Sequence, residues 1–150
     1  SATGTIIAIL STTSFISNDI LLLAFSASFA AKLADTFGSE IGKRWGRTTY
    51  LITSLEKVSP GTEGAISLEG TFASLFGSSL MIYFMSLLGF VPLNYIAVLL
   101  TIVGFVSTLI ESILGALVQN KYRFLTNELI NFIQTTISAV LAFLLSIYIL

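Results

Sequence analysis

Long apolar runs separated by short polar breaks dominate the chain, and three of them reach the length of a membrane span. They cover about residues 71 to 91, 93 to 118 and 128 to 150. Two further runs, 3 to 16 and 19 to 35, are shorter or richer in Ser and Thr. Because the hydrocarbon core of a bilayer is about 30 Å thick and needs roughly 20 apolar residues in a helix, this pattern predicts an all-α, multi-pass transmembrane helical bundle of about five spans.

The overall composition supports a membrane protein made of one domain. Hydrophobic residues make up 55% of the 150 residues, and the mean hydropathy is +0.94. A soluble core of this size could not bury so much apolar side chain. No linker divides the chain, which predicts a single helical domain over residues 1–150. The chain starts at Ser1 and opens almost at once into an apolar run, so we expect that it lacks upstream spans.

One polar segment, residues 36–70, interrupts the apolar pattern. The stretch from Asp35 to Gly70 holds six of the eleven glycines and most of the charged side chains of both signs. The chain has no His and no Cys, which removes the commonest general base and all thiolate chemistry. A site for a charged ligand in this segment must therefore use carboxylates, Lys, Arg and hydroxyl groups.

The positions of the cations predict the orientation of the chain. With the spans as drawn, all seven lie on or next to the membrane face that carries segment 36–70: Lys32, Lys43, Arg44, Arg47, Lys57, Lys121 and Arg123. The positive-inside rule places that face in the cytoplasm, or in the stroma of a plastid, where nucleotides are found. The net charge of −1 and the absence of a basic patch interleaved with aromatics give no indication of nucleic-acid binding.

Glu111 is the clearest functional candidate inside a span, because an ionisable group in hydrocarbon is costly. It shares a helical face with small and polar residues, namely Gly104, Thr108, Ser112, Gly115 and Gln119. For the small residues, a helix-packing seam is the favoured interpretation. For Glu111 itself we favour a functional role.

Asp35 and Glu40 edge the cytoplasmic end of the second apolar run. Asp35 follows Lys32 by three residues, and an intrahelical ion pair is the simpler explanation of that spacing. The ion pair does not explain Glu40. Two carboxylates at one entrance suit a hard cation such as Mg²⁺, which combines one or two carboxylates with substrate phosphates.

Two further polar groups are weaker candidates. The turn Gly61-Thr62-Glu63-Gly64, followed by Ser67 and a helix start, offers backbone amides to a phosphate, but such turns also cap ordinary helices. Lys57 and Arg47 could simply hold the membrane face. In the last span, a polar stripe recurs about every four residues through Asn127, Asn131, Thr135 and Ser138. We favour interhelical hydrogen bonds for this stripe and keep ligand contact as the alternative for the two asparagines.

The segment DTFGSEIGKRWGRTTYLITSLEKVSPGTEGAISLEGTFASL resembles the signature of the phytyl-phosphate kinases of cyanobacteria and chloroplasts, a branch of a wider family of multi-pass membrane proteins. Later, GFVSTLIESILGALVQ and NELINFIQT are similar to the second and third motifs of that family. The form Gly-Thr-Glu-Gly favours the photosynthetic branch.

The resemblance implies transfer of a phosphoryl group from a nucleoside triphosphate, with CTP as the expected donor, to a prenyl monophosphate lipid such as phytyl phosphate. The product would serve tocopherol and related prenylquinone synthesis. It implies catalytic roles for Asp35, Lys57 and Glu111. The expected Mg²⁺ ligands are Asp35, Glu40, Glu69 and Glu111. The expected nucleotide and phosphate ligands are Lys43, Arg47, Gly61, Thr62, Glu63, Gly64, Ser67, Asn127 and Asn131.

A membrane transporter of small ions or lipids is the alternative from another class. Glu111 among Gly and Ser residues could serve as a permeation carboxylate. A pore does not need a polar segment as long as residues 36–70, with balanced charges and six glycines in and beside it. The sequence therefore favours the kinase.

Overall fold

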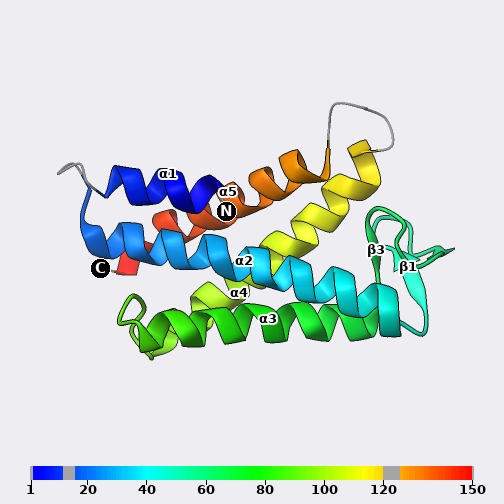
Figure 1. Cartoon of the computed structure of the whole chain (residues 1–150), viewed down its shortest axis with the longest axis horizontal. Coiled ribbons are helices and arrows are strands. Elements are labelled where there is room, and N and C mark those ends of the chain that lie inside the picture. The colour runs from blue at the N-terminus through cyan, green and yellow to red at the C-terminus, as the bar shows by residue number, and fades with distance from the viewer. Residues whose placement is uncertain (1, 12–15, 120–125, 150) are drawn as a thin grey trace.

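The computed structural model describes residues 2–11, 16–119 and 126–149, and within these ranges the chain is built from helices with one small sheet (Figure 1). The helices are α1 (Ala2–Leu10), α2 (Asn18–Trp45), α3 (Leu68–Leu87), α4 (Tyr95–Leu114), a π-helical turn (Gly115–Gln119) and α5 (Asn127–Ile149). The strands are β1 (Thr49–Leu51), β2 (Lys57–Val58) and β3 (Ala65–Ile66). This arrangement confirms the all-α fold class.

Four helices are long and apolar enough to cross a membrane: Asn18–Trp45, Leu68–Leu87, Tyr95–Val118 and Asn127–Ile149. They match four of the five expected runs. The first expected run, 3 to 16, is different, because its helix α1 has only nine residues. At 1.5 Å per residue that helix is about 14 Å long, which is too short to span the hydrocarbon core.

Helix α2 is the centre of the bundle and contacts each of the other four α-helices. Its buried face consists largely of alanines, including Ala27, Ala30 and Ala31. Small residues let the neighbouring helices approach closely. A methyl group on Gly77 of α3 would lie 2.9 Å from the Leu33 carbonyl oxygen, and one on Gly104 of α4 would lie 3.0 Å from the Ala30 methyl. Such packing replaces the hydrophobic driving force that helices lack inside lipid.

Hydrogen bonds between helices add to this packing. Ser138 of α5 donates to the Ala27 carbonyl oxygen (2.9 Å), and Ser78 of α3 donates to the Thr101 carbonyl oxygen (2.8 Å). The Thr135 hydroxyl lies 2.8 Å from the Thr3 hydroxyl of α1. The polar stripe on α5 therefore joins helices at Thr135 and Ser138, as the sequence favoured.

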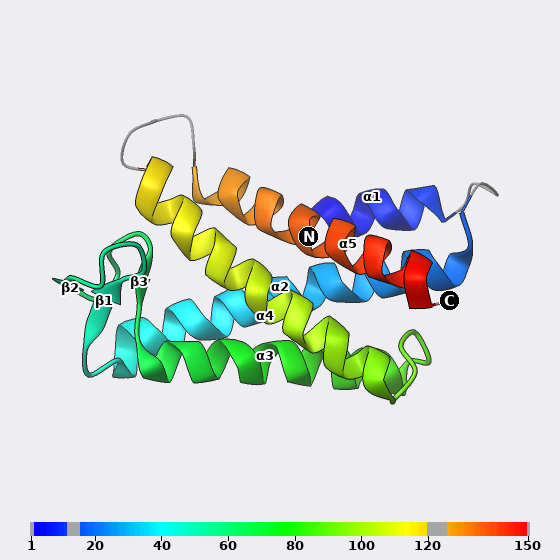
Figure 2. The ribbon, with the colours of Figure 1, turned by 180° about the vertical axis from the view of Figure 1, so that it is seen from behind.

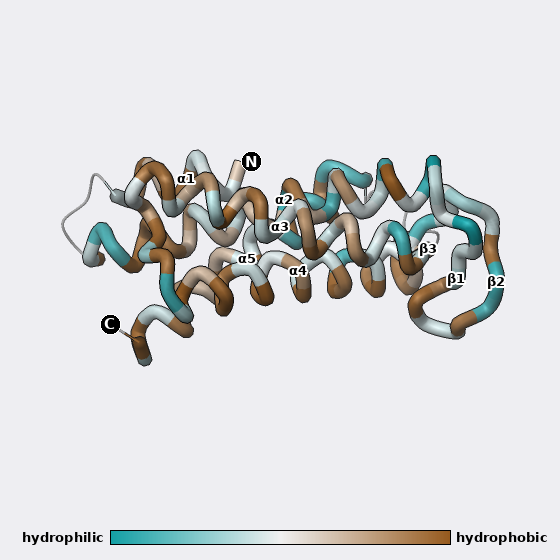
Figure 3. Tube along the Cα trace, turned by 90° about the horizontal axis from the view of Figure 1, so that it is seen from below, coloured by the Kyte–Doolittle hydropathy of each residue, from teal (hydrophilic) through white to brown (hydrophobic). Residues whose placement is uncertain are grey.

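The polar segment ends α2 and forms a sheet that the sequence did not predict. Strands β2, β1 and β3 pair in that order and antiparallel, with Tyr50 opposite both Lys57 and Ile66. Two-residue and three-residue strands are too short to leave a hydrophobic alternation. The sheet lies where α2 ends and α3 begins, at the end of the bundle where hydrophilic residues gather (Figures 2 and 3).

Candidate active site

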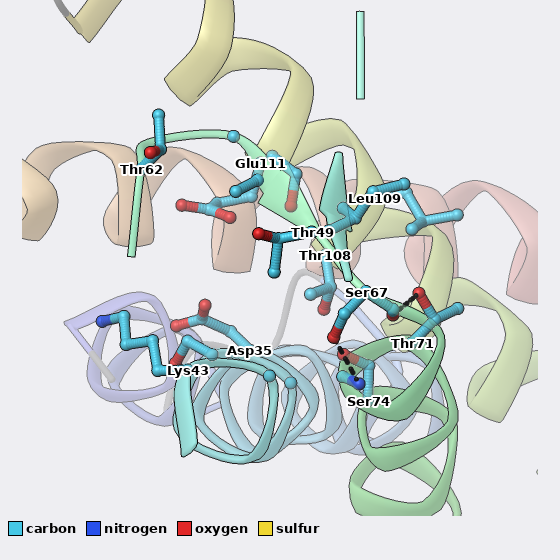
Figure 4. A pocket seen from close by; sticks show the side chains of 18 of the residues that line it. Asp35, Lys43, Thr49, Thr62, Ser67, Thr71, Ser74, Thr108, Leu109 and Glu111 are labelled. Carbon is cyan, nitrogen blue, oxygen red and sulfur yellow. Dashed lines mark hydrogen bonds between the residues drawn. The ribbon is translucent and has the colours of Figure 1, made fainter. Parts of the chain in front are cut away.

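A polar pocket of about 120 Å³ lies at the sheet end of the bundle, between α2, α4, the start of α3 and the segment 61–66. Asp35 and Lys43 approach it from α2, and Thr62 and Glu111 border it from the facing side (Figure 4). These residues are far apart in the sequence. The crossing of α2 and α4 brings them together.

The α2 wall carries one paired carboxylate and one cation. The Asp35 carboxylate is 14% exposed and accepts from the Lys32 ammonium at 2.9 Å, so the expected intrahelical ion pair is present. Lys43 lies two turns further along the helix, also lines the pocket and is exposed. Within the described chain Lys43 forms no ion pair, which leaves its ammonium available to an anionic ligand.

The α4 wall combines packing with the site. Gly104 and Thr108 are buried against α2, and Thr108 lies within 3.5 Å of the Ala31 carbonyl oxygen. One turn further on, Glu111 and Ser112 line the pocket. Packing is thus observed at Gly104 and Thr108, and the functional role of Glu111 stays a prediction. The side chain of Gln119 lies outside the described residues.

Three carboxylates share the pocket, because Glu63 lines it together with Asp35 and Glu111. Lys32, which forms an ion pair with Asp35, brings a positive charge beside this carboxylate. Among residues 2–11, 16–119 and 126–149, no three carboxylates lie close enough to hold a metal ion by themselves. A cation here would need oxygen atoms from a bound substrate as well.

The turn at 61–64 has the backbone geometry that its glycines indicate. Gly61 and Gly64 have φ values of 87° and 75°, in the region that side chains rarely adopt. Around Gly61 there is open space, whereas a methyl group on Gly64 would lie 2.6 Å from the Ser112 carbonyl oxygen. In the described chain the N–H groups of Gly61, Glu63 and Gly64 donate to no protein acceptor. The turn thus packs closely against α4, and three of its amide groups have no acceptor within the described chain.

Helix α3 begins at the floor of the pocket. Ser67 is its N-cap and accepts a hydrogen bond from the Gly70 amide at 3.0 Å. Gly70 sits against α2, where a methyl group would lie 2.8 Å from the Gly38 carbonyl oxygen. The positive end of the α3 dipole therefore lies beside the pocket, which favours anions.

Six of the expected site residues do not line the pocket: Lys57, Arg47, Glu40, Glu69, Asn127 and Asn131. The geometry of the sheet explains why Lys57 does not line the pocket. Thr49 is buried and lines the pocket, and neighbouring residues of a strand point to opposite faces. Tyr50, and Lys57 opposite it, therefore lie on the outer face.

The other five have separate surroundings. The Arg47 backbone N–H donates to Glu69 Oε1 at 3.4 Å, so Glu69 joins the start of α3 to the turn after α2. Glu40 is exposed on α2. Asn127 is exposed at the start of α5, and one turn later the Asn131 side-chain oxygen is buried without a hydrogen-bond partner among the described residues.

Sequence reasoning missed Gln134, which is fully buried and joins three helices. Its Nε2 atom donates to the Ala31 carbonyl oxygen and to Thr108 Oγ1, both at 3.1 Å. Thr108 lines the pocket, so Gln134 supports the inner wall. The signal was present in the sequence, because Gln134 falls between Asn131 and Ser138 at helical spacing of three and four residues.

Comparison with known proteins gives relatives that include two described as uncharacterized membrane proteins. The chain is 42% identical over 125 residues to an uncharacterized membrane protein of Synechocystis sp., covering 81% of this chain and 47% of that one. It is 38% identical over 135 residues to Protein VTE6, chloroplastic, of Arabidopsis thaliana, covering 89% and 40%. An uncharacterized membrane protein of Methanocaldococcus jannaschii is 35% identical over 126 residues, covering 83% and 51%.

The chain thus spans about half the length of the curated relatives it matches. No solved structure matches it. The model of the family described as integral membrane protein DUF92 matches residues 1–139. Together with the four membrane-spanning helices, this match shows that the chain is a multi-pass integral membrane protein of the DUF92 family.

Proposed function

We propose that this chain forms the phosphoryl-transfer site of a prenyl-phosphate kinase, which moves a phosphoryl group from a nucleoside triphosphate, CTP, to phytyl phosphate. The pocket is the observation that carries the proposal. It gathers Asp35, Glu63, Glu111 and Lys43 beside free backbone amides and a helix N-terminus. The motifs that resemble the phytyl-phosphate kinases supply most of these residues, and the chloroplast relative is consistent with the photosynthetic branch.

The charge balance of the pocket supports a metal-chelated substrate. Three carboxylates face one lysine, so a bare polyphosphate would be repelled. Carboxylate oxygens are the ligands that Mg²⁺ prefers, and this ion usually combines one or two of them with substrate phosphates. Asp35 and Glu111 would hold it, with Glu63 nearby. When bound, Mg²⁺ neutralises charge on the transferred phosphoryl group.

The remaining groups suit binding and alignment of two phosphates. A phosphate monoester is already nucleophilic, so the acceptor needs no general base and the absence of His is no obstacle. Lys43 and the amides of the 61–64 turn would hold phosphate oxygens. Ser67 and Gly70 fix the start of α3, whose dipole adds favourable potential.

The size of the pocket indicates which parts of the substrates it holds. A volume of about 120 Å³ is well below the roughly 300–1,000 Å³ of pockets that enclose whole small-molecule ligands. It fits phosphate groups. The nucleoside would therefore lie towards the cytoplasm or stroma, and the isoprenoid tail along the apolar helices.

The test is direct phosphoryl transfer by the full-length protein. Purified protein receives Mg²⁺, phytyl phosphate and CTP labelled in the γ-phosphate, and lipid products are separated by thin-layer chromatography. We expect label in phytyl diphosphate. Labelled ATP and GTP in parallel identify the donor. No labelled lipid with any nucleotide would refute the kinase.

A further inference from the structure

Three cations that do not line the pocket, Arg44, Arg47 and Lys57, lie near the N-terminus of α3, where the lipid-facing side of that helix begins. Helix α3 exposes Leu68 (76%), Phe72 (70%) and Phe76 (60%) along one face, at four-residue spacing. An apolar face of this kind suits the acyl chains of lipids. It starts at the first residue of α3. The edge of the bilayer hydrocarbon therefore lies near the N-terminus of α3.

Two exposed aromatic residues lie at the same level. Trp45 ends α2 and is 62% exposed, and the next residue, Gly46, packs against Ser67. Tyr50 is 42% exposed and pairs across the sheet with Ile66. Each aromatic is thus linked to the residues just before α3, Trp45 through its neighbour Gly46 and Tyr50 directly. Trp and Tyr concentrate at the membrane interface because their rings are apolar and their tips are polar.

Three cations surround these aromatics. The Arg44 guanidinium lies 5.5 Å from the centre of the Trp45 ring, and Lys57 is the cross-strand partner of Tyr50. In the sequence, Arg47 lies between Trp45 and Tyr50. All three are exposed, none lines the pocket and, within the described chain, none forms an ion pair.

We infer that these five residues, Arg44, Trp45, Arg47, Tyr50 and Lys57, form an interfacial patch that binds the phosphate head groups of anionic membrane lipids. The aromatic rings enter the head-group layer, and the cations meet lipid phosphates there. Charge complementarity selects this partner, because basic residues next to a membrane span are attracted to anionic leaflets. The inference does not depend on the proposed kinase activity.

Trp45 makes the inference testable, because it is the only tryptophan of the chain. The full-length protein, with any other tryptophan replaced by phenylalanine, is reconstituted in liposomes of equal parts phosphatidylglycerol and phosphatidylcholine. Bromine, which quenches tryptophan fluorescence on contact, is carried on the acyl chains of one lipid at a time. We expect brominated phosphatidylglycerol to quench Trp45 at least about twofold more strongly, since each cation near the surface favours anionic lipid.

The controls separate the patch from the pocket. The triple variant Arg44→Gln, Arg47→Gln, Lys57→Gln should lose the lipid preference, whereas Lys43→Gln should keep it. About 1 M salt should also abolish the preference in the unmodified protein by screening, which provides a test that needs no substitution. Equal quenching by both lipids, no quenching by either, or a preference that survives the triple variant would overturn the inference.

Discussion

At the scale of single residues, the pocket depends on charges and backbone positions that tolerate little change. Glu111 lies in a membrane-spanning helix, and its carboxylate shares a small space with those of Asp35 and Glu63. Close like charges are unfavourable in a medium of low dielectric constant. A bound cation would therefore stabilise the charged forms of these three carboxylates.

Replacing Glu111 tests this directly. For the proposed phosphoryl transfer by the full-length protein, we expect Glu111→Gln to lower kcat/KM by about 10²-fold or more, the range seen when one preorganised electrostatic contact is removed. Glu128→Gln is the matched control, because Glu128 is exposed at the start of α5 and does not line the pocket. Its rate should stay within about threefold of the unmodified protein. Similar losses in both variants would argue against a specific role for Glu111.

The glycine turn provides a second comparison. Gly61→Ala and Gly64→Ala both place a methyl group on a residue with positive φ, at a cost of roughly 1 kcal/mol each. Only at Gly64 does the methyl group meet the Ser112 carbonyl oxygen, at 2.6 Å. We therefore expect thermal unfolding in detergent to show a clearly lower Tm for Gly64→Ala than for Gly61→Ala. Equal values would mean that the turn does not press on α4.

At the scale of the elements, the contact between α2 and α3 fixes two sides of the pocket. Gly38 and Gly42 of α2 face Gly70 of α3 at the pocket end, and Gly77 continues the contact along α3. An added methyl at Gly70 or Gly77 would lie 2.8 or 2.9 Å from a carbonyl oxygen of α2, so a larger side chain at either position must move one helix.

Gly77→Leu examines this contact away from the pocket. The added side chain meets the Leu33 carbonyl group, so we expect a loss of roughly 1–3 kcal/mol in the free energy of unfolding. Ser79→Leu is the control, because Ser79 is exposed on the same helix and a leucine there suits lipid. Chemical unfolding in detergent measures both. Comparable stability of the two variants would contradict close packing at Gly77.

The elements also show what the sequence could and could not predict. Hydropathy located the four long helices because each buries or exposes apolar residues over 20 residues or more. The sheet left no such pattern, and its register alone decides that Thr49 faces the pocket while Lys57 does not. Asp35 and Glu111 were predictable as costly charges at a membrane boundary or inside a span. Their placement around one pocket follows from the crossing of α2 and α4, which is a tertiary property.

At the scale of the whole molecule, the positions of the cations are consistent with the predicted orientation in the membrane. The five cations within the described residues lie in the second half of α2, in the turn after it or in the sheet: Lys32, Lys43, Arg44, Arg47 and Lys57. Lys121 and Arg123 lie outside the described residues. The turn at Asn94 lies at the opposite end of α3 and α4 from the sheet (Figure 1).

Cysteine labelling checks the orientation. The chain has no native cysteine, so single cysteines at Thr48 and Asn94 report unambiguously once any other cysteine of the full-length protein is replaced. In intact cells or plastids, a membrane-impermeant maleimide should label Asn94→Cys from outside and Thr48→Cys only after the membrane is opened. Labelling of both from the same side would refute the predicted topology.

The length of α2 has a further consequence for kinetics. Its 28 residues measure about 42 Å at 1.5 Å per residue, against a hydrocarbon core of about 30 Å, so the helix is about 12 Å longer than the core, and we expect its charged end with Lys43 to lie at the membrane surface. In the proposed reaction, a lipid substrate dissolved in the bilayer would then reach the pocket by lateral diffusion, with its head group at that surface. The rate should follow the mole fraction of phytyl phosphate in the membrane rather than its amount per volume. Diluting it with inert lipid at constant total substrate should slow the reaction.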